Sequence, residues 1–481
     1  MINFRIIARI FGILLIIEGL LMLFPAMVSI LLKEPAATSF LYSAFITTVT
    51  GVIVYTPLRN EERIYGQREG YIIITGIWVI FALFGTLPFI LSGSIKSFSD
   101  AFFESMSGFS TTGATILTDV GFMPKGILFW RSLNQWIGGM GIIFLSLYVL
   151  PLFRDINIQL STTEFTGPSS KIHPRTIDAG KRLIAIYIAL TLAETVLLVS
   201  GGMTVFDAVC HSFGTLSTGG FSTHSNGLAA YPSPFIKVII TIFMFLAGTN
   251  MAVVYFAVKR DFRKITGNNE FIFYAVICLT FSVLVSLVLY GAGKYSGGNS
   301  FITGSFHVIS ILTTTGYYTD NYGQWGNFLT MILFILMFTG GTAGSTSGGI
   351  KTGRLMIMTM NNRMELRRLI HPNAYIPIWL NRRIVPQNVV YNVLVFVTLY
   401  FLIICLSALV ISFMGYDIIT SFGTSAALLG NIGPGLGAFG PGNNYSALPE
   451  AGKWFMTSLM LLGRLELMTV LILFSRSFYR K

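Results

Sequence analysis

Residues 100–115 read DAFFESMSGFSTTGAT, and a stretch with the same order of features occurs three more times along the chain. Each copy opens on a small or acidic residue, continues as a short amphipathic segment and ends in a glycine-bearing turn. The other copies are DAVCHSFGTLSTGGFS at 207–222, GSFHVISILTTTGYY at 304–318 and DIITSFGTSAALLGNIGPG at 417–435. Aligning the turns places Gly113, Gly219, Gly316 and Gly433 in register, at spacings of 106, 97 and 117 residues.

This repeat predicts four duplicated units, each made of a helix, a short re-entrant helix, a non-helical turn and a second helix. Non-helical backbone at membrane depth is tolerated only where it lines a water-filled cavity, so we expect the four turns to surround one axis. Their carbonyl oxygens can replace the hydration shell of a monovalent cation, and glycine permits the dihedrals that aim them. The alternative is that these turns are external glycine-rich loops of a transporter.

Composition places the whole chain in a membrane. Of its 481 residues 53% are apolar and 11% charged, against about 25% charged in an average soluble domain. The mean hydropathy is +0.71. These values exclude an ordinary cytosolic enzyme, a disordered chain and a disulfide scaffold, and they predict an all-α polytopic membrane protein. The net charge of +12 falls in short clusters between apolar runs, which is typical of cytoplasmic loops and does not indicate a nucleic-acid partner.

A membrane span needs about 20 mostly apolar residues, and ten apolar runs are candidates, of which 328–339 is short and runs directly into a glycine-rich stretch. They are 6–32, 40–58, 71–91, 126–153, 183–201, 235–258, 271–290, 328–339, 389–414 and 454–474. With a cytoplasmic N-terminus, the cytoplasmic segments hold 24 Lys and Arg residues and the external segments hold 7. This asymmetry predicts that both termini are cytoplasmic.

The repeat divides the chain into five parts. We expect an accessory transmembrane hairpin at 1–69, followed by pore units at 70–160, 161–266, 267–384 and 385–481, the third of which carries an intramembrane gating loop.

Beyond the four turns, three runs carry a resemblance to a known family: FWRSLNQWIGGMGII at 129–143, GGTAGSTSGGIKTGR at 340–354 and LGRLELMTVLILF at 462–474. With these the sequence resembles the TrkH/KtrB/HKT superfamily of potassium transporters, and it is similar to the TrkH type almost end to end. The extra N-terminal hairpin favours that type over the shorter KtrB chains.

The resemblance implies four helix–pore-loop–helix units around one pore, preceded by two accessory helices, and potassium uptake across a bacterial cytoplasmic (inner) membrane. It also implies a homodimer on a cytosolic ring of TrkA-type nucleotide-binding regulatory subunits. Potassium is the expected substrate, with rubidium and some sodium also carried, and membrane lipid is the surrounding partner. Neither a cofactor nor an enzymatic activity is expected.

The candidate selectivity filter consists of three residues from each turn, and potassium is the only metal ion expected there. These residues are Thr111, Thr112, Gly113, Ser217, Thr218, Gly219, Thr314, Thr315, Gly316, Asn431, Ile432 and Gly433. In the superfamily a Ser at the first glycine position marks sodium-favouring members, so Gly113 indicates potassium. With one recurring glycine per turn, we expect weaker discrimination than in a TVGYG filter. A sodium-permeable or non-selective cation transporter of the same superfamily is the alternative.

The candidate gate is the glycine-rich run 340–353, which cannot sustain a helix at roughly 1 kcal/mol per glycine. In the family this run occludes the cytoplasmic side of the pore; the alternative is a flexible kink. The candidate gate residues are Gly340, Gly341, Gly344, Ser345, Thr346, Gly348, Gly349, Lys351 and Arg464. Lys351 either lines the inner mouth or extends toward the membrane surface.

Arg464 lies about ten residues into the last span, where an arginine costs about 2.5–3.5 kcal/mol on insertion scales. In the family this arginine lies under the filter and raises the barrier to cations. The alternative is a structural ion pair with a carboxylate such as Glu194.

Four external aspartates, Asp100, Asp207, Asp320 and Asp417, are expected near the entrance, where they concentrate cations. For all but Asp320, a helix cap is the favoured interpretation. Two rival functions remain: an unrelated secondary transporter would show two inverted halves with broken helices, and an intramembrane enzyme would need a catalytic pair, which the five histidines do not supply.

Overall fold

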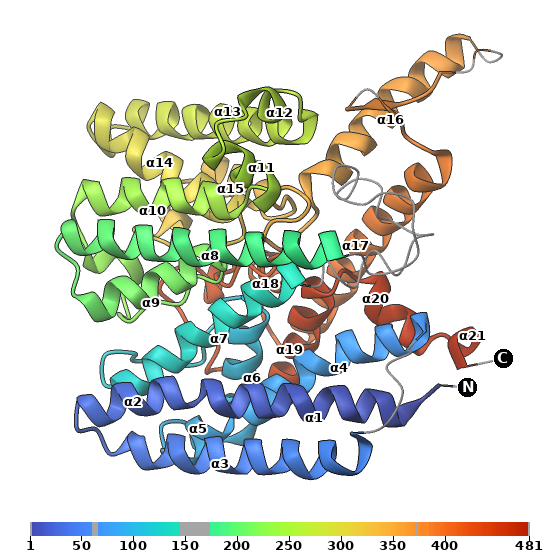
Figure 1. Cartoon of the computed structure of the whole chain (residues 1–481). Helices are drawn as coiled ribbons and strands as arrows, with labels where there is room; N and C mark the ends of the chain where they lie inside the picture. The colour runs from blue at the N-terminus through green and yellow to red at the C-terminus, as the bar shows by residue number, and fades with distance from the viewer. Residues whose placement is uncertain are drawn as a thin grey trace.

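The computed structural model describes residues 2–59, 66–144, 174–371, 374, 376–381 and 383–479. Within these ranges the chain is a bundle of helices that run mostly along one direction, and both ends of the chain lie at the same end of the bundle (Figure 1). The only described sheet is a hairpin of two-residue strands, β1 (Trp379–Leu380) and β2 (Arg383–Ile384). Six helical segments are long and apolar enough to cross a membrane, or up to eight if two bent pairs are counted. The predicted all-α membrane fold is confirmed.

The first part of the chain is a helical hairpin held by close backbone contact. It consists of α1 (Phe4–Leu21), α2 (Leu23–Leu31) and α3 (Ala36–Tyr55). A Cβ built on Gly12 would lie 2.9 Å from the carbonyl oxygen of Gly51, and one built on Gly51 would lie 2.7 Å from that of Gly12. Small residues let two membrane helices approach in this way. The hairpin lies beside α4 and α7 at one edge of the bundle (Figure 1).

After the hairpin, the element order repeats four times: one long helix, one short helix, a turn and a second helix. Repeat 1 contains α4 (Gln67–Gly85), α5 (Leu87–Leu91), α6 (Phe98–Phe109) and α7 (Lys125–Phe144). Repeat 2 contains α8 (Pro174–Ser200), α9 (Val205–Leu216), α10 (Pro234–Ala247) and α11 (Met251–Val258). Repeat 3 contains α13 (Asn269–Gly291), α14 (Gly297–Leu312), α15 (Asn327–Leu336) and α16 (Thr352–Ile370), with α12 (Phe262–Thr266) before it. Repeat 4 contains α17 (Gln387–Phe413), α18 (Ile418–Leu429), α19 (Glu450–Arg464) and α20 (Met468–Leu471), with α21 (Arg476–Tyr479) after it.

Short 3-10 turns join several of these helices. They are η1 (Thr56–Leu58), η4 (Gly227–Ala230), η5 (Tyr322–Gln324), η6 (Gly437–Phe439) and η7 (Ile472–Phe474).

The four short helices α6, α9, α14 and α18 form the centre of the molecule. In α6 every residue from Ala101 to Phe109 is buried, and in α18 every residue from Gly423 to Leu429 is buried. A helix that is buried all round is enclosed by protein on every side. The short helices therefore point their ends, and the turns that follow, into the middle of the bundle.

Two runs that the sequence predicted as continuous spans are broken. Helix α10 meets α11 at an angle of 112°, and α19 meets α20 and η7 at 111°, so neither 235–258 nor 454–474 is one straight helix. At the first break Asn250 caps α11 by accepting a hydrogen bond from the Ala252 amide. A hydropathy average does not reveal such a break, because it depends on how many residues in a run are apolar and not on their backbone dihedral angles.

Two further candidate runs are not full apolar spans in the structure. Helix α7 is described only to residue 144, so the end of the predicted span 126–153 lies outside the described residues, and α7 is too polar to pass as an apolar span. Its Arg131, Asn134 and Gln135 are nevertheless buried, because they face the protein interior. Helix α15 has only 10 residues and is followed by the glycine-rich stretch, as the short run 328–339 predicts.

Candidate functional site

Each short helix ends in a four-residue turn with the same backbone. The turns are Ser110–Gly113 (turn 1), 217–220 (turn 2), 313–316 (turn 3) and 430–433 (turn 4). The second residue of each has a left-handed φ: 51° at Thr111, 56° at Thr218, 58° at Thr314 and 55° at Asn431. The fourth residue is a glycine with φ of 79°, 75°, 77° and 95° at Gly113, Gly220, Gly316 and Gly433, respectively. Four left-handed residues in equivalent places identify four copies of one local structure.

The backbone corrects the predicted register of turn 2 by one residue. Gly220, and not Gly219, has the dihedral of the other three glycines, and Ser217 is the C-cap residue of α9. The equivalent residues of turn 2 are therefore Thr218, Gly219 and Gly220. Two adjacent glycines made both alignments possible in sequence, and only the sign of φ distinguishes them.

The four turns contact one another in cyclic order. At each glycine a Cβ would collide with a carbonyl of the next turn, so no side chain fits there. A Cβ built on Gly113 would lie 2.1 Å from the carbonyl oxygen of Gly219, and one on Gly220 would lie 2.0 Å from that of Thr315. A Cβ on Gly316 would lie 1.7 Å from the oxygen of Ile432, and one on Gly433 would lie 2.6 Å from that of Thr112. The carbonyl involved always belongs to the residue just before the next glycine. The turns therefore close a ring of backbone in the order 1, 2, 3, 4 and back to 1.

Side chains of the turns hold the ring from outside. The hydroxyls of Ser110 and Thr112 lie 2.7 Å apart, and those of Thr313 and Thr315 lie 2.8 Å apart. In turn 4, where hydroxyls are missing, Asn431 donates from Nδ2 to Thr112 Oγ1 at 2.9 Å. The asparagine thus ties the last turn to the first.

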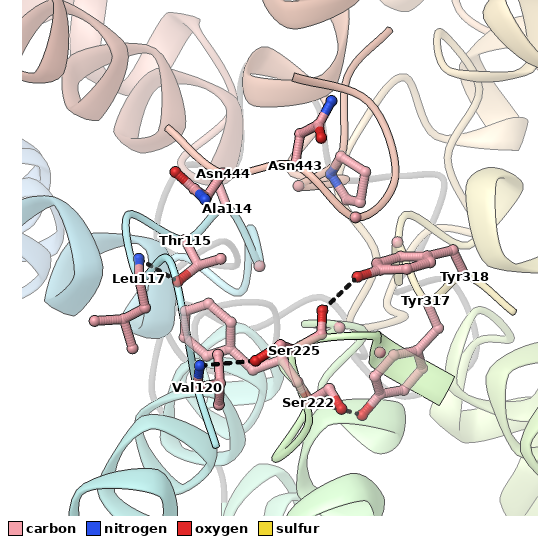
Figure 2. A pocket seen from close by; sticks show the side chains of 18 of the residues that line it. Ala114, Thr115, Leu117, Val120, Ser222, Ser225, Tyr317, Tyr318, Asn443 and Asn444 are labelled. Atoms are coloured by element: carbon pink, nitrogen blue, oxygen red, sulfur yellow. Dashed lines mark hydrogen bonds between the residues drawn. The ribbon is translucent and has the colours of Figure 1, made fainter. Parts of the chain in front are cut away.

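A cavity opens on one side of the ring, and all four turn glycines line it together with Thr115, Ser222, Tyr317, Asn443 and other polar residues (Figure 2). The segments that follow turns 1, 2 and 3, and the 442–445 segment, meet around this cavity, as Figure 2 shows. Ser225 joins the segments after turns 1 and 3 by accepting a hydrogen bond from each. Val120 N–H donates to Ser225 Oγ at 2.9 Å, and Tyr318 Oη donates to Ser225 O at 3.2 Å.

Contrary to expectation, the four external aspartates do not line this cavity. The basic side chains that line it are those of Arg131 and His224. Asp417 caps α18 by accepting from the Thr420 amide, as predicted, and hydrogen bonding by Thr420 lowers the pKa of this carboxyl. The caps of α6 and α9 are Ser97 and Thr204 instead of Asp100 and Asp207.

The remaining aspartates of this set have partners of their own. Asp100 pairs with Lys453, and Asp207 accepts hydrogen bonds from Thr204 and Thr223. Burial raises the pKa of Asp320, but hydrogen bonds from Tyr295 and Trp325 outweigh this and hold it below its usual value.

On the opposite side of the ring lies the glycine-rich loop, residues 337–351, between α15 and α16. Gly348 N–H donates to Thr314 Oγ1 of turn 3 at 2.6 Å, and a Cβ on Gly348 would lie 2.3 Å from the Gly430 oxygen of turn 4. Thr346 Oγ1 lies within hydrogen-bond distance of Leu216 O at the end of α9 (3.0 Å) and of Ala247 O at the end of α10 (3.2 Å). The loop is therefore packed directly against the turns.

Arg464 reaches this loop from the end of α19 and is 4% exposed. Its Nη1 donates to Thr346 O at 2.6 Å and its Nη2 donates to Gly138 O at 3.2 Å. Within the described residues no carboxylate lies at salt-bridge distance from Arg464, so an ion pair with Glu194 is not seen. The guanidinium instead ties the loop to α7.

The base of the loop is held by two residues of opposite charge. Lys351 Nζ turns back into the loop and donates to Ser347 O and Ser345 O, so it does not extend to the membrane surface. Glu270 Oε1, at the start of α13, accepts from Ala343 N at 2.6 Å and from Gly353 N at 3.0 Å. One carboxylate thus joins the start of the loop to the first turn of α16.

All the predicted gate residues lie in this loop or contact it, and the predicted turn residues lie in the ring, with the one shift at turn 2. Sequence reasoning missed Glu270, Asn250 and Gln135. Gln135 supports turn 2, with Nε2 donating to Gly219 O at 2.7 Å and Oε1 accepting from Phe221 N at 3.2 Å. A glutamine inside an apolar run was the available signal, since a buried amide needs hydrogen-bond partners.

Three comparisons relate this chain to known proteins. A family model described as TrkH, cation transport protein, matches residues 38–479. The chain is 37% identical over 484 residues to the Trk system potassium uptake protein TrkH of Salmonella typhimurium, with 100% of each chain covered. It is 33% identical over 480 residues to the Trk system potassium uptake protein TrkG of Escherichia coli, with 99% of each covered. The crystal structure of the potassium transporter TrkH from Vibrio parahaemolyticus matches with a TM-score of 0.91 and 34% identity over 100% of both chains.

Proposed function

The chain belongs to the TrkH family of cation transport proteins, and from this premise we propose that its ring of four turns is the ion path. The protein is a membrane protein that takes up potassium; potassium is its substrate, and it is not an enzyme. The observation that supports the proposed path is the cyclic contact of the four turn glycines, each against a carbonyl of the next turn.

In this proposal each of the four repeats contributes one side of a single pore, and the filter residues are Thr111–Gly113, Thr218–Gly220, Thr314–Gly316 and 431–433. Backbone carbonyls select a monovalent cation by replacing its water. The short helices support this role, because their C-terminal ends carry partial negative charge and all four end at the ring. Rubidium is carried with potassium, and some sodium passes.

The glycine-rich loop is the gate in this proposal. It lies against turns 3 and 4, on the side of the ring away from the outer cavity, so an ion leaving the ring meets it next. Arg464 holds the loop in place and adds a fixed positive charge beneath the ring.

The regulatory partner acts through α16. This helix begins at the base of the loop and projects away from the bundle on the side of the two termini (Figure 1). We place that side in the cytoplasm of a bacterial inner membrane, because the basic residues gather there. A TrkA-type nucleotide-binding ring that moves α16 would also move the loop, because Glu270 is bonded to both. A homodimer would present two α16 helices to this ring.

Flux into liposomes tests this function. The purified protein is reconstituted with an imposed potassium gradient and no other driving force, and potassium, rubidium and sodium entry are compared. Entry of potassium and rubidium well above that of sodium supports a selective pore. Equal entry of all three supports the alternative, a non-selective cation path, and no entry without a second gradient contradicts a passive pore.

A further inference from the structure

The position nine residues before each turn glycine is occupied by a buried residue in all four repeats. These residues are Glu104, His211, His307 and Thr424. They lie on the short helices behind the turns, and none of them belongs to the proposed filter or gate.

In the first three repeats this side chain presents an acceptor to the segment just after the glycine of its own turn. Glu104 accepts from Thr115 Oγ1 at 3.0 Å and from Ile116 N at 2.9 Å. The histidines use Nε2: His211 faces Ser222 Oγ at 3.1 Å, and His307 accepts from Thr319 N at 3.3 Å. Both histidines have Nδ1 within 2.9 Å of a helix carbonyl, an arrangement that favours the tautomer with the hydrogen on Nδ1 and an acceptor at Nε2; His307 Nε2 also lies 3.3 Å from Asp320 O.

Repeat 4 lacks this contact. Thr424 Oγ1 is buried and has no hydrogen-bond partner among the described residues. Tyr445 supports turn 4 instead, donating from its hydroxyl to Gly433 O at 2.8 Å.

Repeat 1 differs because its acceptor is also half of a buried ion pair. Arg131 Nε lies 2.7 Å from Glu104 Oε1, and the two side chains are 2% and 0% exposed. The same guanidinium donates to Thr115 Oγ1 at 3.2 Å, after turn 1, and to Ser222 O at 3.3 Å, after turn 2. Its carbon lies 4.1 Å from the centre of the Phe221 ring, which follows Gly220 directly.

Arg131 therefore joins the outer segments of two turns and also lines the outer cavity. A fixed positive charge at the mouth of a cation path repels its substrate unless a counter-charge cancels it. Glu104 is that counter-charge, and its contact with Nε leaves the two Nη atoms of the guanidinium to donate to Ser222 and Thr115.

We propose that Glu104 and Arg131 are a positioning pair that fixes the spacing between turns 1 and 2 and thereby sets the preference for potassium over sodium. Glu104 has a second task, which is to cancel the charge of Arg131 at the outer mouth. This inference rests on the proposed function, because it assumes that the ring is the ion path.

Two single variants separate the two tasks. Glu104→Gln keeps an acceptor oxygen but leaves the guanidinium without a counter-charge, so the half-saturating potassium concentration should rise about threefold or more. Arg131→Lys keeps the charge but cannot contact Thr115, Ser222 and the Phe221 ring together, so the potassium-to-sodium flux ratio should fall about threefold with little change in half-saturation.

The double variant and a matched control complete the test. Glu104→Gln with Arg131→Gln removes both charges and should restore half-saturation but not the flux ratio. Thr424→Val, at the equivalent position without a hydrogen bond, should leave both quantities unchanged.

Potassium and sodium entry into liposomes and the melting temperature are measured for every variant. If half-saturation and the flux ratio are unchanged in both single variants, the proposal is overturned. A lower melting temperature alone would show only that the pair has a structural role. If Glu104→Gln cannot be purified folded, Arg131→Lys and Thr115→Val carry the test of positioning through the flux ratio. If the unaltered protein carries no potassium, it is the proposed function that fails; if it does and the variants match it, only this inference fails.

Discussion

At the scale of single residues, the four turn glycines are positions where a side chain does not fit. Each lacks room for a Cβ because a carbonyl of the next turn occupies that space, and each has a left-handed φ that other residues rarely adopt. A substitution at any one of them must therefore move two turns.

Replacing Gly113 by Ser should raise sodium entry relative to potassium. The new Cβ would start 2.1 Å from the Gly219 oxygen, so turn 2 must shift and one carbonyl leaves its place at the ring. The ratio of sodium to rubidium uptake by reconstituted protein measures this. An unchanged ratio would show that Gly113 does not line the ion path.

The two adjacent glycines of turn 2 give a test of register. Gly220→Ala should abolish selective uptake, because its Cβ would lie 2.0 Å from the backbone oxygen of Thr315. The atoms nearest to a Cβ at Gly219 belong to the side chain of Gln135, at 2.4 Å, and a side chain shifts more easily than backbone, so Gly219→Ala should keep most uptake. Uptake assays on both variants decide the register, and the reverse order of severity would restore the alignment made from sequence.

Arg464→Ala should raise potassium flux and leave the potassium-to-sodium ratio nearly unchanged. The substitution removes two donors to Thr346 and Gly138, and it removes a repulsion of about 3–4 kcal/mol for a cation 4–6 Å away at an effective dielectric of 20. Flux and melting temperature are measured on the same purified variant. A lower melting temperature without a gain in flux would contradict the gating role.

Arg464→Lys then separates the two causes. Lysine keeps the positive charge but cannot donate in a fork to two carbonyls on different elements. Flux like that of the unaltered protein would assign the barrier to charge, whereas flux like that of the alanine variant would assign it to the hold on the loop.

At the scale of elements, the second helices of repeats 2, 3 and 4 break at the level where they pass the ring. Glycines mark this level in all four repeats and allow close contact with the ends of the short helices. A Cβ on Gly139 would lie 2.8 Å from the Cα of Ser217, and one on Gly248 would lie 2.6 Å from Thr313 Cγ2. In repeats 1 and 2 the second helix thus supports the turn of the following repeat, whereas Gly463 in repeat 4 lies against Leu429 O of its own repeat.

Deleting residues 344–349 should increase flux and make it insensitive to any cytosolic partner. The deletion removes Thr346 and Gly348, which contact α9, α10 and turn 3, and it leaves in place the bridge between Thr339 and Ile350. Potassium flux is compared with and without the partner. Loss of flux in a protein that remains folded would indicate a structural kink instead of a gate.

Thr346→Val is the milder control for this deletion. It keeps the length and volume of the loop but removes the hydroxyl that lies near Leu216 O and Ala247 O. An increase in flux smaller than that of the deletion would show that these contacts contribute to closing the path.

At the scale of the whole molecule, the distribution of basic residues predicts which end of the bundle faces the cytoplasm. Residues 33 and 263 are both exposed and lie on connecting segments predicted to face opposite sides, the second of them within α12. In a chain without its three native cysteines, Lys33→Cys should react with an impermeant maleimide on intact cells, and Arg263→Cys should react only after the membrane is opened. The opposite pattern would reverse the proposed orientation and place the loop on the outer side of the ring.

Much of this protein was determined by its sequence alone. Apolar runs of span length, basic clusters between them and the recurrence of 100–115 were sufficient for the all-α membrane fold, because these depend on local composition and order. The turn residues and the glycine-rich loop were also found, since a glycine-rich break in an apolar run is unusual by itself.

Only the tertiary structure decided the register of turn 2, the bends after α10 and α19 and the partners of Arg464. Each of these depends on which distant carbonyl or side chain occupies the neighbouring space: Thr315 O for Gly220, Ala343 O for Asn250, and Thr346 O for Arg464. The same holds for Glu104 and Arg131, which lie 27 residues apart and are brought together with the segments after two turns. Hydropathy and spacing carry no information about such contacts, because they arise only when four repeats close around one axis.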